Sequence, residues 1–138
     1  MRTHRRIATL LCVGVIAVAT TATASGDGSR GRQWAAVYLD QATLIGATIV
    51  QGPVVFIHDD AKMARGEPCT SVRLLEPGVG PGEEIAAFHC VPVRRAAVNR
   101  FTLRTRPNTD LGVGCILTEY QFAGDPEGHG VPYTTNAH

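Results

Sequence analysis

The segment 124–130 holds the residue types best suited to chemistry. Asp125, Glu127 and His129 alternate along it, so in an extended backbone their side chains would share one side. Carboxylates beside an imidazole suit a divalent cation or an acid–base pair. Several glycines would let the backbone bend around a ligand. The same composition also describes a solvated turn, so both interpretations stay open.

Two more histidines could join such a site. His58 ends an apolar run, and His89 precedes Cys90 near the end of a predicted strand. Neighbouring strand residues point to opposite faces, so His89 and Cys90 cannot bind one ion unless a bulge intervenes. For His89 the alternative is a partly buried structural histidine. The only cofactor that these residues indicate is a divalent metal ion. Its candidate ligands are His58, His89, Asp125, Glu127 and His129.

Three cysteines, Cys69, Cys90 and Cys115, lie outside the apolar N-terminal segment that contains Cys12. Loop entropy does not select a pair among them, because a disulfide between any two of them would stabilise the fold by a similar free energy, about 3–4 kcal/mol. Strand register does select one. If residues 76–83 close a symmetric hairpin, Cys69 faces Cys90, within disulfide range. The sequence therefore predicts a disulfide between Cys69 and Cys90 and a free Cys115.

The same hairpin register agrees with the hydrophobic pattern. It pairs Leu74 with Ile85 and Val72 with Ala87, so four apolar residues lie on one face, as a core requires. Arg73 and Glu84 fall on the other face together with the cysteines.

A run of basic residues follows this hairpin. Closing a second hairpin around residues 107–112 places Arg100 opposite Glu119, as a cross-strand ion pair on a solvated face. The alternative is a site for an anion such as a phosphate or an acidic polysaccharide. The candidate anion-binding residues are Arg94, Arg95, Arg100 and Arg104.

Several known kinds of site are excluded. The chain has no Cys-x-x-Cys pair, no haem attachment motif and no blue-copper ligand order. It also lacks the Gly-x-Ser-x-Gly, His-Glu-x-x-His, phosphate-loop and dinucleotide-binding motifs. No catalytic residue is assigned.

Short runs of β-branched and aromatic residues, separated by Gly, Pro, Asn and Asp, predict strands. Turn signals lie at residues 51–52, 76–82 and 107–112. Residues 60–65 predict a single helical turn that Asp60 caps and Gly66 ends. The expected fold is all-β, a small antiparallel sandwich or barrel of about seven strands. The predicted strands span residues 35–40, 43–50, 53–58, 69–75, 84–91, 98–106 and 113–122.

The first 24 residues have the order of features found in a signal peptide: a basic start, a short apolar run and an Ala-x-Ala end. Cleavage after Ala24 would export the chain to the periplasm or the medium of a bacterium, and would remove Cys12. Arg5 and Arg6 leave twin-arginine export open beside the general route. The mature chain would then contain a flexible leader (25–33), one β-domain (34–132) and a disordered tail (133–138).

Charge limits the partners of the mature chain. Three of the 13 Lys and Arg residues lie in the predicted signal, which leaves 10 cations against 12 acids, a net charge of −2. This balance does not favour nucleic acid, and no mature segment is apolar enough to cross a membrane. Two functions remain. One is a non-catalytic β-domain with a binding or structural role. The other is a metal-binding or hydrolytic protein with a His/Asp/Glu site near 124–130.

Overall fold

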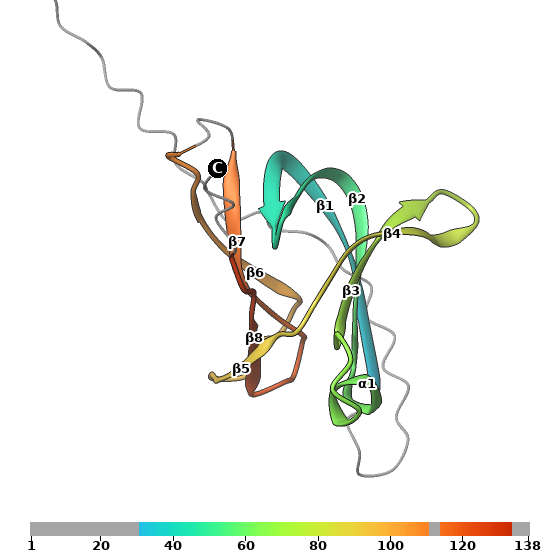
Figure 1. The fold of residues 1–138 in the computed structure, drawn as a ribbon, viewed down its shortest axis with the longest axis vertical. Coiled ribbons are helices and arrows are strands. Elements are labelled where there is room, and N and C mark those ends of the chain that lie inside the picture. Colours follow the sequence, from blue (N-terminus) through green and yellow to red (C-terminus); the bar gives the residue numbers. More distant parts are fainter. Residues whose placement is uncertain (1–30, 111–113, 134–138) are drawn as a thin grey trace, which may run out of the picture.

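The computed structural model describes residues 31–110 and 114–133 (Figure 1). The predicted signal peptide and most of the predicted leader and tail lie outside these residues. The described chain contains one short helix, α1 (Asp60–Ala64), and eight strands. The strands are β1 (Arg32–Ile45), β2 (Thr48–Asp59), β3 (Thr70–Glu76), β4 (Gly80–Phe88), β5 (Val91–Arg94), β6 (Thr102–Pro107), β7 (Cys115–Gln121) and β8 (Glu127–Gly130).

The prediction of an all-β fold is confirmed, but β5 and β8 were not predicted as strands and several strand ends differ. β1 begins at Arg32, inside the predicted leader, and β1 and β2 are longer than expected. Their turn lies at Gly46 and residue 47, where Gly46 has a φ of +62°. The expected turn at Gly52 is instead an irregular point within the β1–β2 ladder, which glycine tolerates at a φ of +94°.

The predicted helical turn is present as α1, but Asp59 caps it instead of Asp60. The Asp59 carboxylate accepts hydrogen bonds from the backbone N–H groups of Ala61 and Lys62. These are two of the amides that a helix start leaves without partners. Gly66 follows the turn at a φ of +72°, as expected for a residue that ends a helix.

All eight strands belong to one sheet. Its order is β4-β3-β2-β1-β7-β8-β5, and β6 pairs with β7. Antiparallel pairing holds throughout except between β1 and β7, which run parallel and share only two residue pairs, Thr43 with Cys115 and Leu44 with Ile116. Figure 1 shows β1–β4 on one side of the molecule and β5–β8 on the other. The sheet therefore bends at the short β1–β7 join.

The core fills the space between the two halves of the sheet. Phe56 of β2 lies 5.4 Å from Phe101 and 5.3 Å from Tyr120 of β7, measured between ring centroids. Phe122 packs against both Phe101 and Tyr120. These tilted and edge-on contacts are the favoured geometry for aromatic rings. In the described part of the chain, no helix is long and apolar enough to span a membrane.

The sheet comes close to closing but does not become a barrel. β4 and β5 are its two edges, yet only His89 and Cys90 connect them in the chain. The two edges must therefore approach each other near Cys90, although no β4–β5 hydrogen-bonded pairs form among the described strands. We call this gap between the edges the seam.

The β3–β4 hairpin forms in a register that differs from the prediction by one to three residues. The difference is largest near the turn, where Leu75 pairs with Pro81, and irregularities on either side of Arg73 reduce it, so that Val72 pairs with Ala86 instead of Ala87. Leu74 is exposed as a result, whereas Ile85 still packs against the core. Arg73 and Glu84 do pair, at 3.7 Å.

The β6–β7 hairpin also differs from the prediction. Arg104, and not Arg100, lies opposite Glu119. Glu119 is 5% exposed and accepts hydrogen bonds from Arg104 at 3.1 Å and from Arg95 at 2.9 and 2.6 Å. The expected solvated ion pair is therefore a buried carboxylate held by two guanidinium groups.

Candidate metal centre

Three side chains that bind soft metal ions converge at one end of the seam, and a fourth lies beside one of them. His58, Cys69 and Cys90 each offer a ligand atom within 4.8 Å of the other two. His129 is next to them, with Nδ1 3.6 Å from the Cys90 Sγ atom. All four side chains are buried, the most exposed being Cys90 at 8%.

Strand register explains this convergence. His58 lies near the end of β2 and pairs with Thr70 of β3, so it is close to Cys69, the residue before β3. Cys90 follows β4, whose last residue pairs with Thr70 as well. His129 belongs to β8, on the other half of the sheet. The cluster therefore joins both sides of the seam.

His58 is buried without a hydrogen bond at either ring nitrogen among the described residues. The nearest carboxylate oxygen, from Asp60, lies 3.5 Å from Nδ1. Burial lowers the pKa of His58, and the carboxylates of Asp60, Glu127, Asp125 and Asp59 oppose this shift only in part. The imidazole is therefore neutral near pH 7, which is the form that binds metal ions.

The ring of His129 packs against two other rings. It stacks on Tyr120 at 4.8 Å with an interplanar angle of 18°, and its centroid lies 4.3 Å from that of His58. The Asp125 carboxylate is 4.0 Å from Nε2, and it also accepts a hydrogen bond from Gln33.

The two thiols of the cluster lie unusually close together. The Sγ atoms of Cys69 and Cys90 are 2.9 Å apart, and both cysteines are free. The backbone N–H of Cys90 donates to the Sγ of Cys69 at 3.2 Å. Burial, together with the neighbouring Cys69, raises the pKa of Cys90 to about 12. Without a cation the Cys90 thiol is thus protonated, and a bound metal ion would supply the charge that makes it a thiolate.

Tyr120 completes the wall of the cluster. Its hydroxyl forms a 2.5 Å hydrogen bond with the hydroxyl of Thr70, and both residues are fully buried. Burial raises the pKa of Tyr120, so the phenol keeps its proton. Tyr120 therefore supplies a flat, uncharged surface for His129.

Two sulfur and two nitrogen ligands are typical of tetrahedral zinc sites in proteins. Bonds of about 2.3 Å to sulfur and 2.0 Å to nitrogen place neighbouring S and N ligands roughly 3.6 Å apart. The Cys90–His129 distance of 3.6 Å agrees with this value. The two sulfur atoms would have to separate to about 3.7 Å from their present 2.9 Å.

The structure brings together only some of the residues that the sequence suggested. His58, Asp125, Glu127 and His129 lie together, with Glu127 3.9 Å from His129. His89 is exposed, so its interpretation as a partly buried histidine is wrong. Residues 127–130 form strand β8 and His129 is buried, so these residues are not the solvated turn that their composition also suggested.

The candidate anion-binding residues are divided between two environments. Arg95 and Arg104 both pair with Glu119. Arg94 and Arg100 are exposed. An anion bound by all four would therefore compete with a buried carboxylate.

Sequence reasoning did not include Cys69 and Cys90 among the metal ligands, because it assigned them to a disulfide. Their sulfur atoms are neighbours, as the hairpin predicted, but they are not at bonding distance. The pairing of β2 with β3 is the signal that could have found the site, since it places His58 beside Cys69. Cys115, expected to be free, is disulfide-bonded in the structure.

Comparisons of the chain with protein-family models, with curated proteins and with solved structures found no match. The case for a function therefore depends on the geometry of the seam.

Proposed function

We propose that the chain is an exported, non-catalytic β-domain that binds one zinc ion through His58, Cys69, Cys90 and His129. The main support is His58, which is 1% exposed and has no hydrogen bond at either ring nitrogen among the described residues. An unpaired buried polar group lowers stability by about 1–3 kcal/mol. A metal ion bound to one His58 nitrogen would remove the penalty at that nitrogen.

The surroundings of the cluster favour a structural site over a catalytic one. Catalytic zinc keeps one coordination position open for water or substrate, whereas structural zinc is fully enclosed by protein ligands. The four proposed ligands are all nearly inaccessible to solvent. Zinc would connect β2 and the start of β3 with β8 across the seam, where backbone pairing is missing.

Export is part of the proposal, and its support is the N-terminal sequence alone. The signal-peptide features of the first 24 residues suggest a periplasmic or extracellular setting. A small domain in such a setting often depends on a metal ion or a disulfide for stability.

Metal content tests the proposal directly. The protein is purified under reducing conditions, loaded with Zn²⁺, dialysed, and its zinc-to-protein ratio is measured by mass spectrometry. Loading with Co²⁺ should give the visible bands of tetrahedral cobalt and the ultraviolet charge-transfer bands of thiolate ligands. We expect one ion per chain.

Substitutions identify the ligands. His58→Gln and Cys90→Ser should each weaken zinc binding by ~100-fold or more, since removing even an orienting neighbour of a ligand weakens binding by about 10–100-fold. His89→Gln is the matched control, because His89 precedes Cys90 but is exposed. Equal loss in His58→Gln and His89→Gln, or no zinc in the reduced wild type, would show that the proposed site is wrong.

A second candidate role for the thiols is a structural disulfide. The 2.9 Å distance between the Cys69 and Cys90 sulfur atoms is shorter than a tetrahedral site requires, and an oxidising compartment favours the bond. Closing this loop of about 21 residues would stabilise the domain by roughly 3 kcal/mol. The two roles exclude each other for one molecule. Peptide mapping of protein recovered from the host, without reduction, separates them.

A further inference from the structure

A second feature lies on the face of the sheet opposite the core. A cavity of about 490 Å³ is lined by Arg32 and Trp34 of β1, Val55 and Ile57 of β2, and Leu75, Gly80 and Pro81 of the β3–β4 hairpin. On β1 and β2 these residues alternate with core residues such as Ala35 and Phe56. The volume lies in the range of about 300–1,000 Å³ typical of small-molecule sites.

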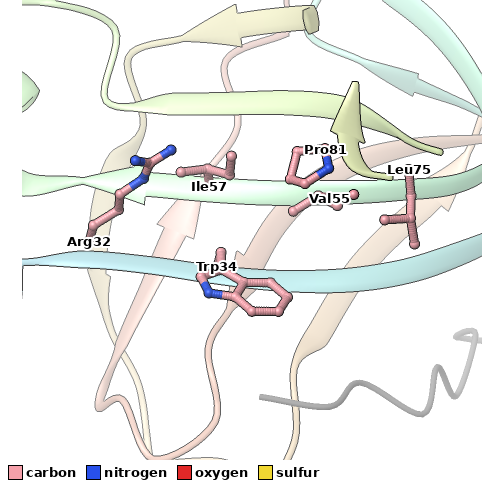
Figure 2. Close-up of a pocket in the computed structure, with 7 residues that line it drawn as sticks. Arg32, Trp34, Val55, Ile57, Leu75 and Pro81 are labelled. Atoms are coloured by element: carbon pink, nitrogen blue, oxygen red, sulfur yellow. The ribbon is translucent and has the colours of Figure 1, made fainter. Parts of the chain in front are cut away.

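The cavity is apolar along its length and basic at one end. Figure 2 shows Arg32 at one end and Leu75 at the other, with Ile57, Val55 and Pro81 between them and Trp34 along the side. Trp34 pairs with Ile57 across β1 and β2 and remains 40% exposed. A tryptophan that lines an open apolar hollow is well placed to contact a ligand.

The basic end continues into a smaller hollow of about 180 Å³. Arg32 and Ile57 line both hollows, and Lys62 and Asp59 line the smaller one. Neither Arg32 nor Lys62 forms an ion pair within residues 31–110 and 114–133. The Asp59 carboxylate already accepts the two N–H groups at the start of α1. Two cations are therefore available to an anionic group at this end.

We propose that this cavity binds a medium-chain aliphatic carboxylate, with its carboxylate on Arg32 and its alkyl chain along Trp34, Val55 and Ile57. An apolar channel with cations at one end complements an alkyl chain that ends in one negative charge. Cys69 of the proposed zinc centre lines the smaller hollow, but neither Arg32 nor the apolar channel belongs to that centre, so the proposal does not depend on bound zinc.

Trp34 is the only tryptophan of the chain, so its fluorescence reports on the cavity alone. Sodium hexanoate, octanoate and decanoate are titrated below their micellar concentrations. We expect a saturable change in emission, with affinity rising by up to roughly fourfold for each added methylene. Acetate should give no change, because it has the charge without the chain.

The contribution of the charge is tested by changing either partner. Arg32→Gln should weaken decanoate binding by about fivefold, as expected for a partly exposed ion pair. Decanol, which is neutral, should bind the wild type about as weakly as decanoate binds the variant. Arg100→Gln is the matched control, an exposed arginine that does not line the cavity.

Three results would overturn the proposal. The first is the absence of a saturable change with decanoate. The second is equal affinity for decanol and decanoate in the wild type. The third is equal loss of affinity in Arg32→Gln and Arg100→Gln.

Discussion

Replacing Glu119 with glutamine should destabilise the fold in a way that depends on pH. The substitution keeps the shape of the side chain but removes a charge that is 5% exposed and accepts three hydrogen bonds from Arg95 and Arg104. Breaking a fully buried ion pair costs about 3–5 kcal/mol. The guanidinium side chains here are 42% and 36% exposed, so water replaces part of the lost interaction. We expect a loss of about 2 kcal/mol in unfolding free energy near pH 7.

The direction of the pH effect follows from the pKa of Glu119. The hydrogen bond from Arg95, aided by the charges of Arg104 and Arg95, lowers this pKa below its usual 4.5, against the opposing effect of burial. A depressed carboxylate pKa adds stability above the unfolded pKa, and this stability is lost as pH falls through the folded value. The unfolding free energies of the wild type and Glu119→Gln should therefore differ at pH 7 and become equal toward pH 2.

Urea unfolding followed by circular dichroism at several pH values measures this difference. Glu67→Gln is the matched control, because the Arg65–Glu67 pair has an equally short contact of 2.6 Å but is about half exposed. That control should unfold as the wild type does. A difference for Glu119→Gln that is the same at pH 7 and pH 2, or one no larger than that of the control, would refute the reasoning.

Three further predictions follow from the seam, the sheet join and the N-terminus. Removing zinc from the loaded protein with a chelator should lower the melting temperature, because free zinc at 100 times its dissociation constant adds about 2.7 kcal/mol to the unfolding free energy. Calorimetry measures this change, and the melting temperature of the control variant Cys90→Ser should not respond to the chelator. Gly114→Ala should destabilise the protein more than Gly66→Ala in the same unfolding assay. Both glycines have positive φ, but an added Cβ at Gly114 would overlap the carbonyl of Ala42, whereas at Gly66 it meets open space. Mass spectrometry of the exported protein should find Ser25 as its first residue, and an intact Met1 would exclude the predicted cleavage.

Local patterns in the sequence were sufficient for the fold class and for the proximity of the cysteines. Short β-branched runs and turn residues predicted strands, and a near-symmetric turn placed Cys69 beside Cys90. The register itself was wrong by one to three residues, because neither the position of the turn nor the irregularities around Arg73 leave a clear mark in the sequence. The prediction that Cys69 and Cys90 lie close together still held, because both cysteines lie just beyond the paired residues.

The burial of polar residues could not be read from the sequence. His129 stands among glycines and acids, which suggested a solvated segment, yet His58 from the other half of the fold and Cys90 at the seam lie against it. Glu119 is buried for a similar reason, since its two arginine partners come from separate segments. Only the tertiary fold brings such partners together, and the hydrophobic periodicity of a single strand does not reveal which residues they are.

The short parallel join between β1 and β7 also has a consequence for the order of folding. β1 to β4 form a meander in which each strand pairs with the next strand in the chain. The hydrogen bonds of this half can therefore form early in folding. The other half attaches through Thr43 and Leu44, which meet Cys115 and Ile116 from a distant part of the chain. Contacts between residues so far apart form slowly, because the intervening chain must first lose its freedom. The rate-limiting step of folding should therefore be the docking of β6–β8 onto a meander that already exists. Amide hydrogens of β2 and β3 should accordingly become protected from exchange before those of β7 and β8.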